Sequence, residues 1–221
     1  MFRDFISLIF PQNCINCQQS LNSEEKFLCI SCKIDLPFTI DFENKENDLF
    51  KKFSFESKIK SAGAYMYFYH GGVAQKLLYH LKYHGKKEIG FILGKWLALR
   101  LSQNRYDLVI PVPLHKSKMR KRTFNQSAEI ALGVAEDVNA EINTELIERI
   151  ISTKSQTRKS KVERWANMQN VYSKIGADLS GKSILVVDDV ITTGATVGML
   201  CERLVEANVE SIHIAAVARG K

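Results

Sequence analysis

Apolar runs of strand length alternate along this chain with stretches of helical period, and this alternation limits the possible folds more than any other feature. Short apolar runs are typical of buried strands, and apolar residues spaced three and four apart are typical of helices that pack on a sheet. The alternation predicts an α/β fold with a parallel sheet. We expect strands at 61–69, 107–112, 183–187 and 211–217, a weaker strand at 142–150, and helices near 73–81, 87–103, 124–138 and 196–207.

The size and composition of the chain suit one full domain with a small appendage. The chain has 221 residues, of which 45% are apolar and 25% charged, and these values exclude disordered and collagen-like chains. Residues 33–60 show no clean period and are interpreted as a connecting segment. We therefore expect a small domain at 1–45 and the α/β domain at 46–221.

The first ten residues carry apolar side chains at helical spacing, namely Phe2, Phe5, Ile6, Ile9 and Phe10. This spacing favours a short helix that packs on the protein's own body, with a lipid or a partner as the alternative. The run is far shorter than the roughly 20 residues that a membrane span needs. It also lacks the clear basic region and cleavage site of a secretory signal, so we expect no transmembrane segment and a cytoplasmic protein.

Four of the five cysteines form two C-x-x-C pairs, Cys14 with Cys17 and Cys29 with Cys32. Two such pairs on a short ribbon suit a tetrahedral zinc ion, because each pair supplies two thiolates from one turn. Disulfides and redox pairs are the alternatives. Disulfides are disfavoured in a reducing compartment, and a redox C-x-x-C pair would not need a second pair beside it. Four protein ligands leave no position for water, so the predicted zinc is structural.

The stretch from Ile184 to Thr196 joins a buried strand to two carboxylates and a loop of small residues that opens a helix. Gly194 and Ala195 let the backbone approach an anion, and Thr192, Thr193 and Thr196 add hydroxyl donors. Asp188 and Asp189 precede the loop at the strand's carboxyl edge, where carboxylates accept hydrogen bonds from sugar hydroxyls. The combination predicts a site for a ribose 5-phosphate.

This stretch resembles the 5-phosphoribosyl 1-pyrophosphate (PRPP) motif of type I phosphoribosyltransferases. The resemblance implies the type I fold, a parallel sheet flanked by helices and covered by a hood. It also implies that Asp188 and Asp189 hold the ribose hydroxyls, that Thr192 to Thr196 hold the 5-phosphate, and that magnesium arrives with the pyrophosphate.

A wider resemblance covers nearly the whole chain. The order of motifs along the chain resembles the ComF family of competence-related proteins. These motifs are the cysteine module, Pro111–His115, Arg122–Gln126, Thr153–Gln156, Arg164, Asn167 and the PRPP motif. The family pattern usually has glycine where this chain has Thr123, and threonine resists the positive φ that glycine allows. The resemblance implies a role in DNA uptake, with single-stranded DNA and uptake proteins as further partners.

The net charge is +7, from 31 Lys+Arg and 24 Asp+Glu. Residues 1–45 carry −2 and residues 46–221 carry +9, and two basic segments with charges of +5 and +4 equal that surplus. Segment 115–122 follows a predicted strand and contains Lys116, Arg120 and Arg122, and segment 154–164 contains Arg158, Lys159 and Arg164. Cations there would stabilise a departing pyrophosphate or bind a nucleic-acid backbone, although any single lysine is more simply a solvated residue.

Other basic and aromatic residues have a less definite interpretation. Phe124 and Trp165 are interpreted as core or loop anchors, with base stacking as the alternative. The cluster of His80, Lys82, His84, Lys86 and Lys87 is interpreted as a solvated surface, with a second metal site or a basic rim as the alternative.

Two functions remain open. The first is a phosphoribosyltransferase that moves ribose 5-phosphate from PRPP to an acceptor, with Asp188 and Asp189 as the catalytic pair. The second is a non-catalytic protein that binds single-stranded DNA with the same fold. The sequence identifies neither the acceptor nor the oligomeric state.

Overall fold

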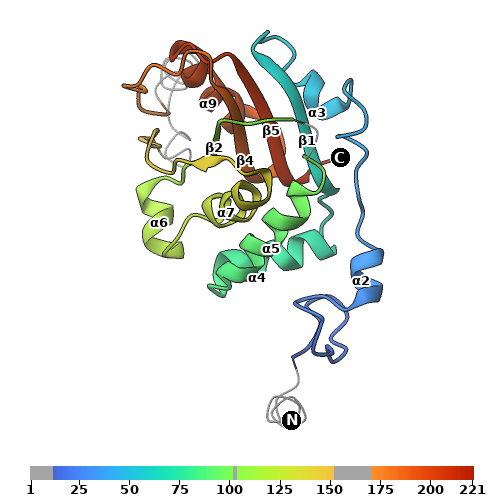
Figure 1. Ribbon diagram of the computed structural model, residues 1–221. Coiled ribbons are helices and arrows are strands. Elements are labelled where there is room, and N and C mark those ends of the chain that lie inside the picture. The colour runs from blue at the N-terminus through green and yellow to red at the C-terminus, as the bar shows by residue number, and fades with distance from the viewer. Residues whose placement is uncertain (1–11, 102–103, 152–170) are drawn as a thin grey trace, which may run out of the picture.

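The computed structural model describes residues 12–101, 104–151 and 171–221 (Figure 1). Its centre is a five-stranded parallel sheet with the order β1-β5-β4-β2-β3. The strands are β1 Ile59–Tyr67, β2 Leu108–Pro111, β3 Glu141–Ile142, β4 Ser183–Ile191 and β5 Ser211–Arg219. The helices are α2 Ile30–Ile34, α3 Asp48–Lys51, α4 Val73–Tyr83, α5 Lys87–Ala98, α6 Lys116–Arg122, α7 Gln126–Val138 and α9 Ala195–Glu206. The parallel α/β class predicted from the alternation is confirmed.

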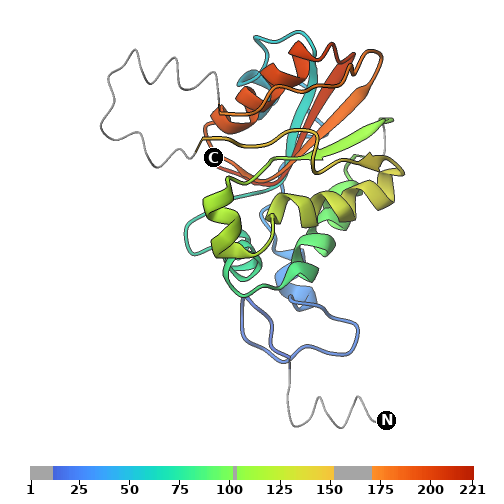
Figure 2. The same ribbon diagram turned by 90° about the vertical axis from the view of Figure 1, so that its left-hand side faces the viewer.

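Both faces of the sheet are covered, which is why the central strands are apolar on both sides. Helices α4, α5 and α7 lie on one face and α9 on the other (Figure 2). Successive side chains of β4 point to opposite faces of the sheet. Leu185 and Val187 are buried in the first core, beneath α4, α5 and α7, and Ile184 and Val186 in the second core, beneath α9.

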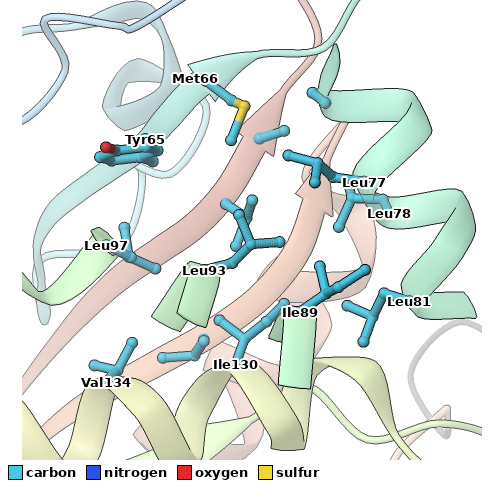
Figure 3. Packing of buried hydrophobic residues seen from close by; sticks show 14 of the residues in the cluster. Tyr65, Met66, Leu77, Leu78, Leu81, Ile89, Leu93, Leu97, Ile130 and Val134 are labelled. Carbon is cyan, nitrogen blue, oxygen red and sulfur yellow. The ribbon is translucent and has the colours of Figure 1, made fainter. Parts of the chain in front are cut away.

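The first core is built where three helices meet beneath the sheet. In Figure 3 the side chains of Leu81, Ile89 and Ile130 approach one another from α4, α5 and α7, and each is at most 1% exposed. Burial of side chains of this size contributes about 2 kcal/mol each. The packing fixes α4 and α7 on this face of the sheet, so that Lys82 of α4 and Ser127 of α7 contact the aspartates of β4.

Several predicted boundaries differ from the structure. The strand expected to end at residue 187 continues to Ile191, because β5 pairs with it as far as Arg219. The helix predicted at 87–103 is shorter in the structure, where α5 ends at Ala98. The weak strand predicted at 142–150 corresponds to the two residues of β3, Glu141–Ile142. Residues 116–122 of the first basic segment form the helix α6, which no apolar period in the sequence predicts.

Part of the connecting segment packs tightly on the edge of the sheet. Asp41 is 3% exposed and accepts two hydrogen bonds from the Arg219 guanidinium, at 2.7 and 2.9 Å. Its carboxylate also accepts from the Ala64 N–H in β1 at 3.2 Å. The division of the chain near residue 45 stays a prediction.

Among the residues that the structure describes, no helix is long and apolar enough to cross a membrane. The N-terminal residues predicted to form an apolar helix face, from Phe2 to Phe10, lie outside the described ranges.

Candidate functional site

The four cysteines of the two C-x-x-C pairs come together in a small N-terminal module that resembles a zinc ribbon. Their sulfur atoms all lie within 4.8 Å of one another, and three of the four residues are buried. Left-handed backbone at Gln18, with φ of 65°, and Phe27, with φ of 61°, turns the chain within the module. A Zn–S bond of about 2.3 Å in a tetrahedral site separates the sulfurs by about 3.8 Å. The 3.6 Å between the sulfurs of Cys17 and Cys29 fits that geometry, so the cluster can hold a structural zinc ion.

The module is attached to helix α4 by polar and apolar contacts. The Lys76 ammonium donates to the backbone carbonyl of Asn16 at 3.0 Å and to its side-chain oxygen at 2.9 Å. The Asn16 amide in turn donates to the sulfur of Cys32 at 3.3 Å. Cys14, Ile15 and Leu28 belong to the same buried cluster as the α4 leucines. The module is therefore anchored to the helix that also reaches the cavity described below.

The predicted phosphate loop lies between β4 and α9. Gly194 has φ of 82° and is the N-cap residue of α9, where it offers no side chain as a cap. The Thr193 hydroxyl accepts from the Ala195 N–H at 3.4 Å, at the first residue of the helix. A Cβ atom at this position would lie 2.9 Å from the ring of Phe53, so the loop needs glycine for both conformation and space. Helix N-termini with free N–H groups attract anions. Thr192, Thr193 and Ala195 are exposed beside it.

Asp188 is a buried carboxylate within β4. Its Oδ1 accepts from the Ser127 hydroxyl at 2.9 Å and from the Asp189 N–H at 2.8 Å. Burial, followed by the charge of Asp189, raises the pKa of Asp188 from 3.8 to about 7. The side chain is therefore near the midpoint of its titration at neutral pH.

Asp189 is held by a lysine from a different part of the chain. The Lys82 ammonium of α4 lies 2.6 Å from Asp189 Oδ2, and both side chains are at most 20% exposed. This places Lys82 in the site, although its sequence cluster was interpreted as solvated. Of the other residues of that cluster, His84, Lys86 and Lys87 are exposed, as a solvated surface requires, and His80 is partly buried.

Four cations and the two carboxylates line a cavity of about 190 Å³ at the carboxyl ends of β2 and β4. The cations are Lys82, Lys118, Arg122 and Arg149. Burial, then the charges of Arg149 and Arg122, lower the pKa of Lys118. Because crowding of like charges costs free energy, the cavity favours an anionic ligand that relieves it.

Two residues between α6 and α7, Thr123 and Asn125, set the backbone beside Arg122 and Gln126, which line the cavity. Asn125 caps α7 by accepting from the Ser127 N–H at 3.1 Å, and its amide donates to the Val112 carbonyl at 3.0 Å. Thr123 ends α6 with φ of 66°, a left-handed conformation that is strained for a β-branched residue. The chain thus adopts, with threonine, a conformation that the more usual glycine would reach without strain.

The predicted basic residues are distributed over different environments. Arg122 lines the cavity and donates to Gln126 at 2.8 Å. Lys116 is exposed and pairs with Glu148 at 2.7 Å, and Arg120 is exposed. Arg158, Lys159, Arg164 and Trp165 lie outside the described residues. Phe124 is 5% exposed, which supports its interpretation as a core residue and excludes base stacking on it in this conformation.

The chain matches one protein-family model and is similar to proteins named for DNA utilization and for competence. A family model described as the phosphoribosyl transferase domain matches residues 131–221. The DNA utilization protein YhgH of Escherichia coli O157:H7 is 27% identical over 150 residues, which are 65% of this chain and 66% of that protein. Competence protein F of Haemophilus influenzae is 27% identical over 131 residues, 56% of this chain and 57% of that protein. Competence protein ComFC of Bacillus subtilis is 22% identical over 196 residues, 87% of this chain and 78% of that protein.

Among solved structures, the chain is similar to the glutamine PRPP amidotransferase from B. subtilis. The TM-score is 0.44 and the identity 23%, and the similarity covers 58% of this chain and 26% of the other. The matches with competence proteins confirm the predicted resemblance to the ComF family. Together with the parallel sheet and the domain match, they confirm the predicted fold class.

Proposed function

Because this chain is a relative of competence proteins F and ComFC and carries a phosphoribosyl transferase domain, we propose that it binds PRPP and transfers its ribose 5-phosphate during DNA uptake. The observation that carries the proposal is the cavity at the carboxyl end of β4, where two carboxylates lie among four cations beside the N-terminus of α9, whose N-cap residue is a glycine. Ligands of parallel sheets bind at this end of the strands.

Each part of the cavity has a role in this proposal. Asp188 and Asp189 accept hydrogen bonds from the ribose hydroxyls, and the backbone and hydroxyls of Thr192 to Thr196 hold the 5-phosphate. Lys118 and Arg122 stabilise the charge that builds up on the departing pyrophosphate. Magnesium suits the site because it prefers oxygen ligands, which the pyrophosphate and the two carboxylates supply, and it would neutralise the leaving group.

The two basic segments supply further proposed contacts with the pyrophosphate, namely Lys116, Arg120, Arg158, Lys159 and Arg164. This part of the proposal rests on the ComF resemblance. We place the activity in the cytoplasm, where thiols stay reduced and available as metal ligands.

Calorimetry with PRPP and magnesium tests the proposal. We expect the wild type to bind and the Asp188→Ala/Asp189→Ala variant to lose binding, because the ribose loses both acceptors. A Glu202→Ala/Glu210→Ala variant removes two exposed carboxylates and serves as the matched control. Unchanged affinity in the Asp188/Asp189 variant contradicts the placement of the ribose. Pyrophosphate release with a panel of nucleobases then tests transfer, and no release with any acceptor contradicts it.

A single structural zinc ion in the cysteine module is the second part of the proposal. We expect one zinc per chain by elemental analysis, and loss of that zinc in a Cys29→Ser variant, since a structural site needs all four thiolates. The Cys201→Ala variant is the control, because Cys201 is buried in the core of the α/β domain. Full zinc content in the Cys29→Ser variant contradicts the assignment.

An exposed aromatic surface on α4 favours a second candidate function, the binding of single-stranded DNA. Tyr79 and Tyr83 are 52% and 63% exposed and their ring centroids lie 5.0 Å apart. The Arg122 guanidinium lies 5.6 Å from the Tyr83 ring. Exposed rings beside cations suit unstacked bases and their phosphates.

Oligonucleotide titrations over a range of salt concentrations test this second function. We expect the Tyr79→Ala/Tyr83→Ala variant to lose about tenfold or more in affinity, because each stacked base contributes about 1–3 kcal/mol. Phe55→Ala, at a ring that is 72% exposed on another part of the chain, is the matched control. Undetectable binding of the wild type at low salt excludes this function.

A further inference from the structure

The segment between the cysteine module and β1 forms a short helix that is fixed to the sheet. Asn47 caps α3 by accepting from the Phe50 N–H at 2.8 Å. Its amide donates to the carbonyls of Asp41 and Asn44, each at 2.9 Å, and to that of Ala62 in β1 at 2.8 Å. Asn47 is 6% exposed, so these bonds are shielded from water. Helix α3 is therefore held beside β1, as Figure 1 shows, in spite of its four residues.

The two residues that follow α3 reach the phosphate loop. The Phe53 ring is 1% exposed and packs against Gly194 at the N-cap of α9. The Lys52 ammonium donates to the Thr192 carbonyl at 2.7 Å, across 140 residues of sequence. An ammonium has three donors, and this bond uses one of them.

The phosphate loop itself offers a phosphate only uncharged donors, so a lysine beside it adds the positive charge that the loop lacks. Within the loop, Thr192, Thr193, Gly194 and Thr196 supply hydroxyl and N–H donors, and all of these are uncharged. A phosphomonoester carries close to two negative charges at neutral pH. Hydrogen bonds in which both groups are charged are stronger than those with neutral donors.

We propose that Lys52 is a phosphate-binding residue, which contacts the 5-phosphate of the ribose held by the loop between β4 and α9. The inference rests on the proposed function and extends its site to the connecting segment, outside the residues matched by the phosphoribosyl transferase domain. The bond to Thr192 holds the ammonium at the loop. Within the part of the chain that the structure describes, its two other donors have no protein acceptor, and they can bind a phosphate.

Calorimetric titration with ribose 5-phosphate and, separately, with pyrophosphate tests this role. We expect Lys52→Gln to weaken the binding of ribose 5-phosphate about tenfold, as for loss of a charged hydrogen bond, and Lys52→Arg to retain it within about twofold. Pyrophosphate, which is expected among the cations of the cavity, should bind all variants equally. Lys51→Gln is the matched control, since Lys51 is the neighbouring exposed lysine and pairs with Asp48 at 3.3 Å.

The glutamine variant separates a charge contact from a purely structural one. Glutamine keeps an N–H donor for the Thr192 carbonyl, so a lysine that only anchors the loop would be replaced without loss of affinity. Equal affinity of wild type and Lys52→Gln for ribose 5-phosphate therefore overturns the inference and leaves the proposed function standing. A wild type that binds neither ribose 5-phosphate nor PRPP overturns both.

Discussion

The buried carboxylate of Asp188 makes the stability of this protein depend on pH, and the variant Asp188→Asn should reveal it. An unfolded chain ionises this group near pH 3.8, whereas the folded protein keeps the proton until about pH 7. As the pH rises between these values the unfolded state loses a proton that the folded state retains, so the folded protein loses stability. Each pH unit costs about 1.4 kcal/mol. Asparagine has the same shape and no charge, so it removes this loss.

The expected result is a stability difference that changes with pH. Between pH 5 and pH 8 the free energy of unfolding of Asp188→Asn should rise relative to the wild type by about 3 kcal/mol, since the loss stops above the folded-state pKa. Urea denaturation at pH 5, 6, 7 and 8 measures it for both proteins. Protonation of the cysteine module at low pH affects both equally and leaves the difference unchanged.

Asp178→Asn is the control for this experiment. Hydrogen bonds from the hydroxyl and the N–H of Ser180 lower the pKa of Asp178, and this carboxylate is on the surface. A lowered pKa gives the opposite sign, so Asp178→Asn should gain nothing as the pH rises. An advantage of Asp188→Asn that is the same at pH 5 and pH 8 refutes the reasoning.

Three further substitutions test the strained and buried positions described above, each by urea denaturation at pH 7. Thr123→Gly should stabilise the protein by about 1 kcal/mol, because a left-handed backbone costs a side-chain-bearing residue about 1–2 kcal/mol and glycine returns part of that gain to the unfolded state. Gly194→Ala should destabilise it by about 2 kcal/mol, since the new methyl group meets both the positive φ and the Phe53 ring. Asp41→Asn should destabilise it by about 3–5 kcal/mol, because it leaves the buried Arg219 charge without its carboxylate.

For each of these three substitutions, one result would contradict the reason given for it. A neutral or destabilising Thr123→Gly shows that the left-handed conformation is not strained. A tolerated Gly194→Ala means that the loop can move away from Phe53. A loss below about 1 kcal/mol in Asp41→Asn shows that water reaches Arg219 and solvates it.

The fold could be predicted from the sequence because its signals are local. The apolar period of β1, α4 and β5 is visible within single stretches of sequence. The boundaries of these three elements in the structure differ from the predicted ones by only a few residues. The end of β4 differs because its last residues are held by pairing with β5, from Asp188 opposite Ala216 to Ile191 opposite Arg219, and the sequence of β4 alone does not record this.

The candidate site could be predicted only in the part that lies in one stretch. The carboxylates and the phosphate loop are contiguous from Asp188 to Thr196, and the structure keeps them together. Lys82, Ser127 and Arg149 reach the same cavity from three distant segments. Their convergence depends on how α4 and α7 pack on the sheet, and a polar residue in such a segment looks like any solvated one.

The strand order has a consequence for how the chain folds. Strand β1 comes first in the sequence, but its sheet partner β5 comes last, and the Asp41–Arg219 pair closes over the same long interval. During synthesis the apolar β1 therefore leaves the ribosome long before the strand that covers its edge. Such late pairing slows folding and exposes an unpaired strand to aggregation. We expect nascent chains that stop before β5 to be the species that most need chaperones.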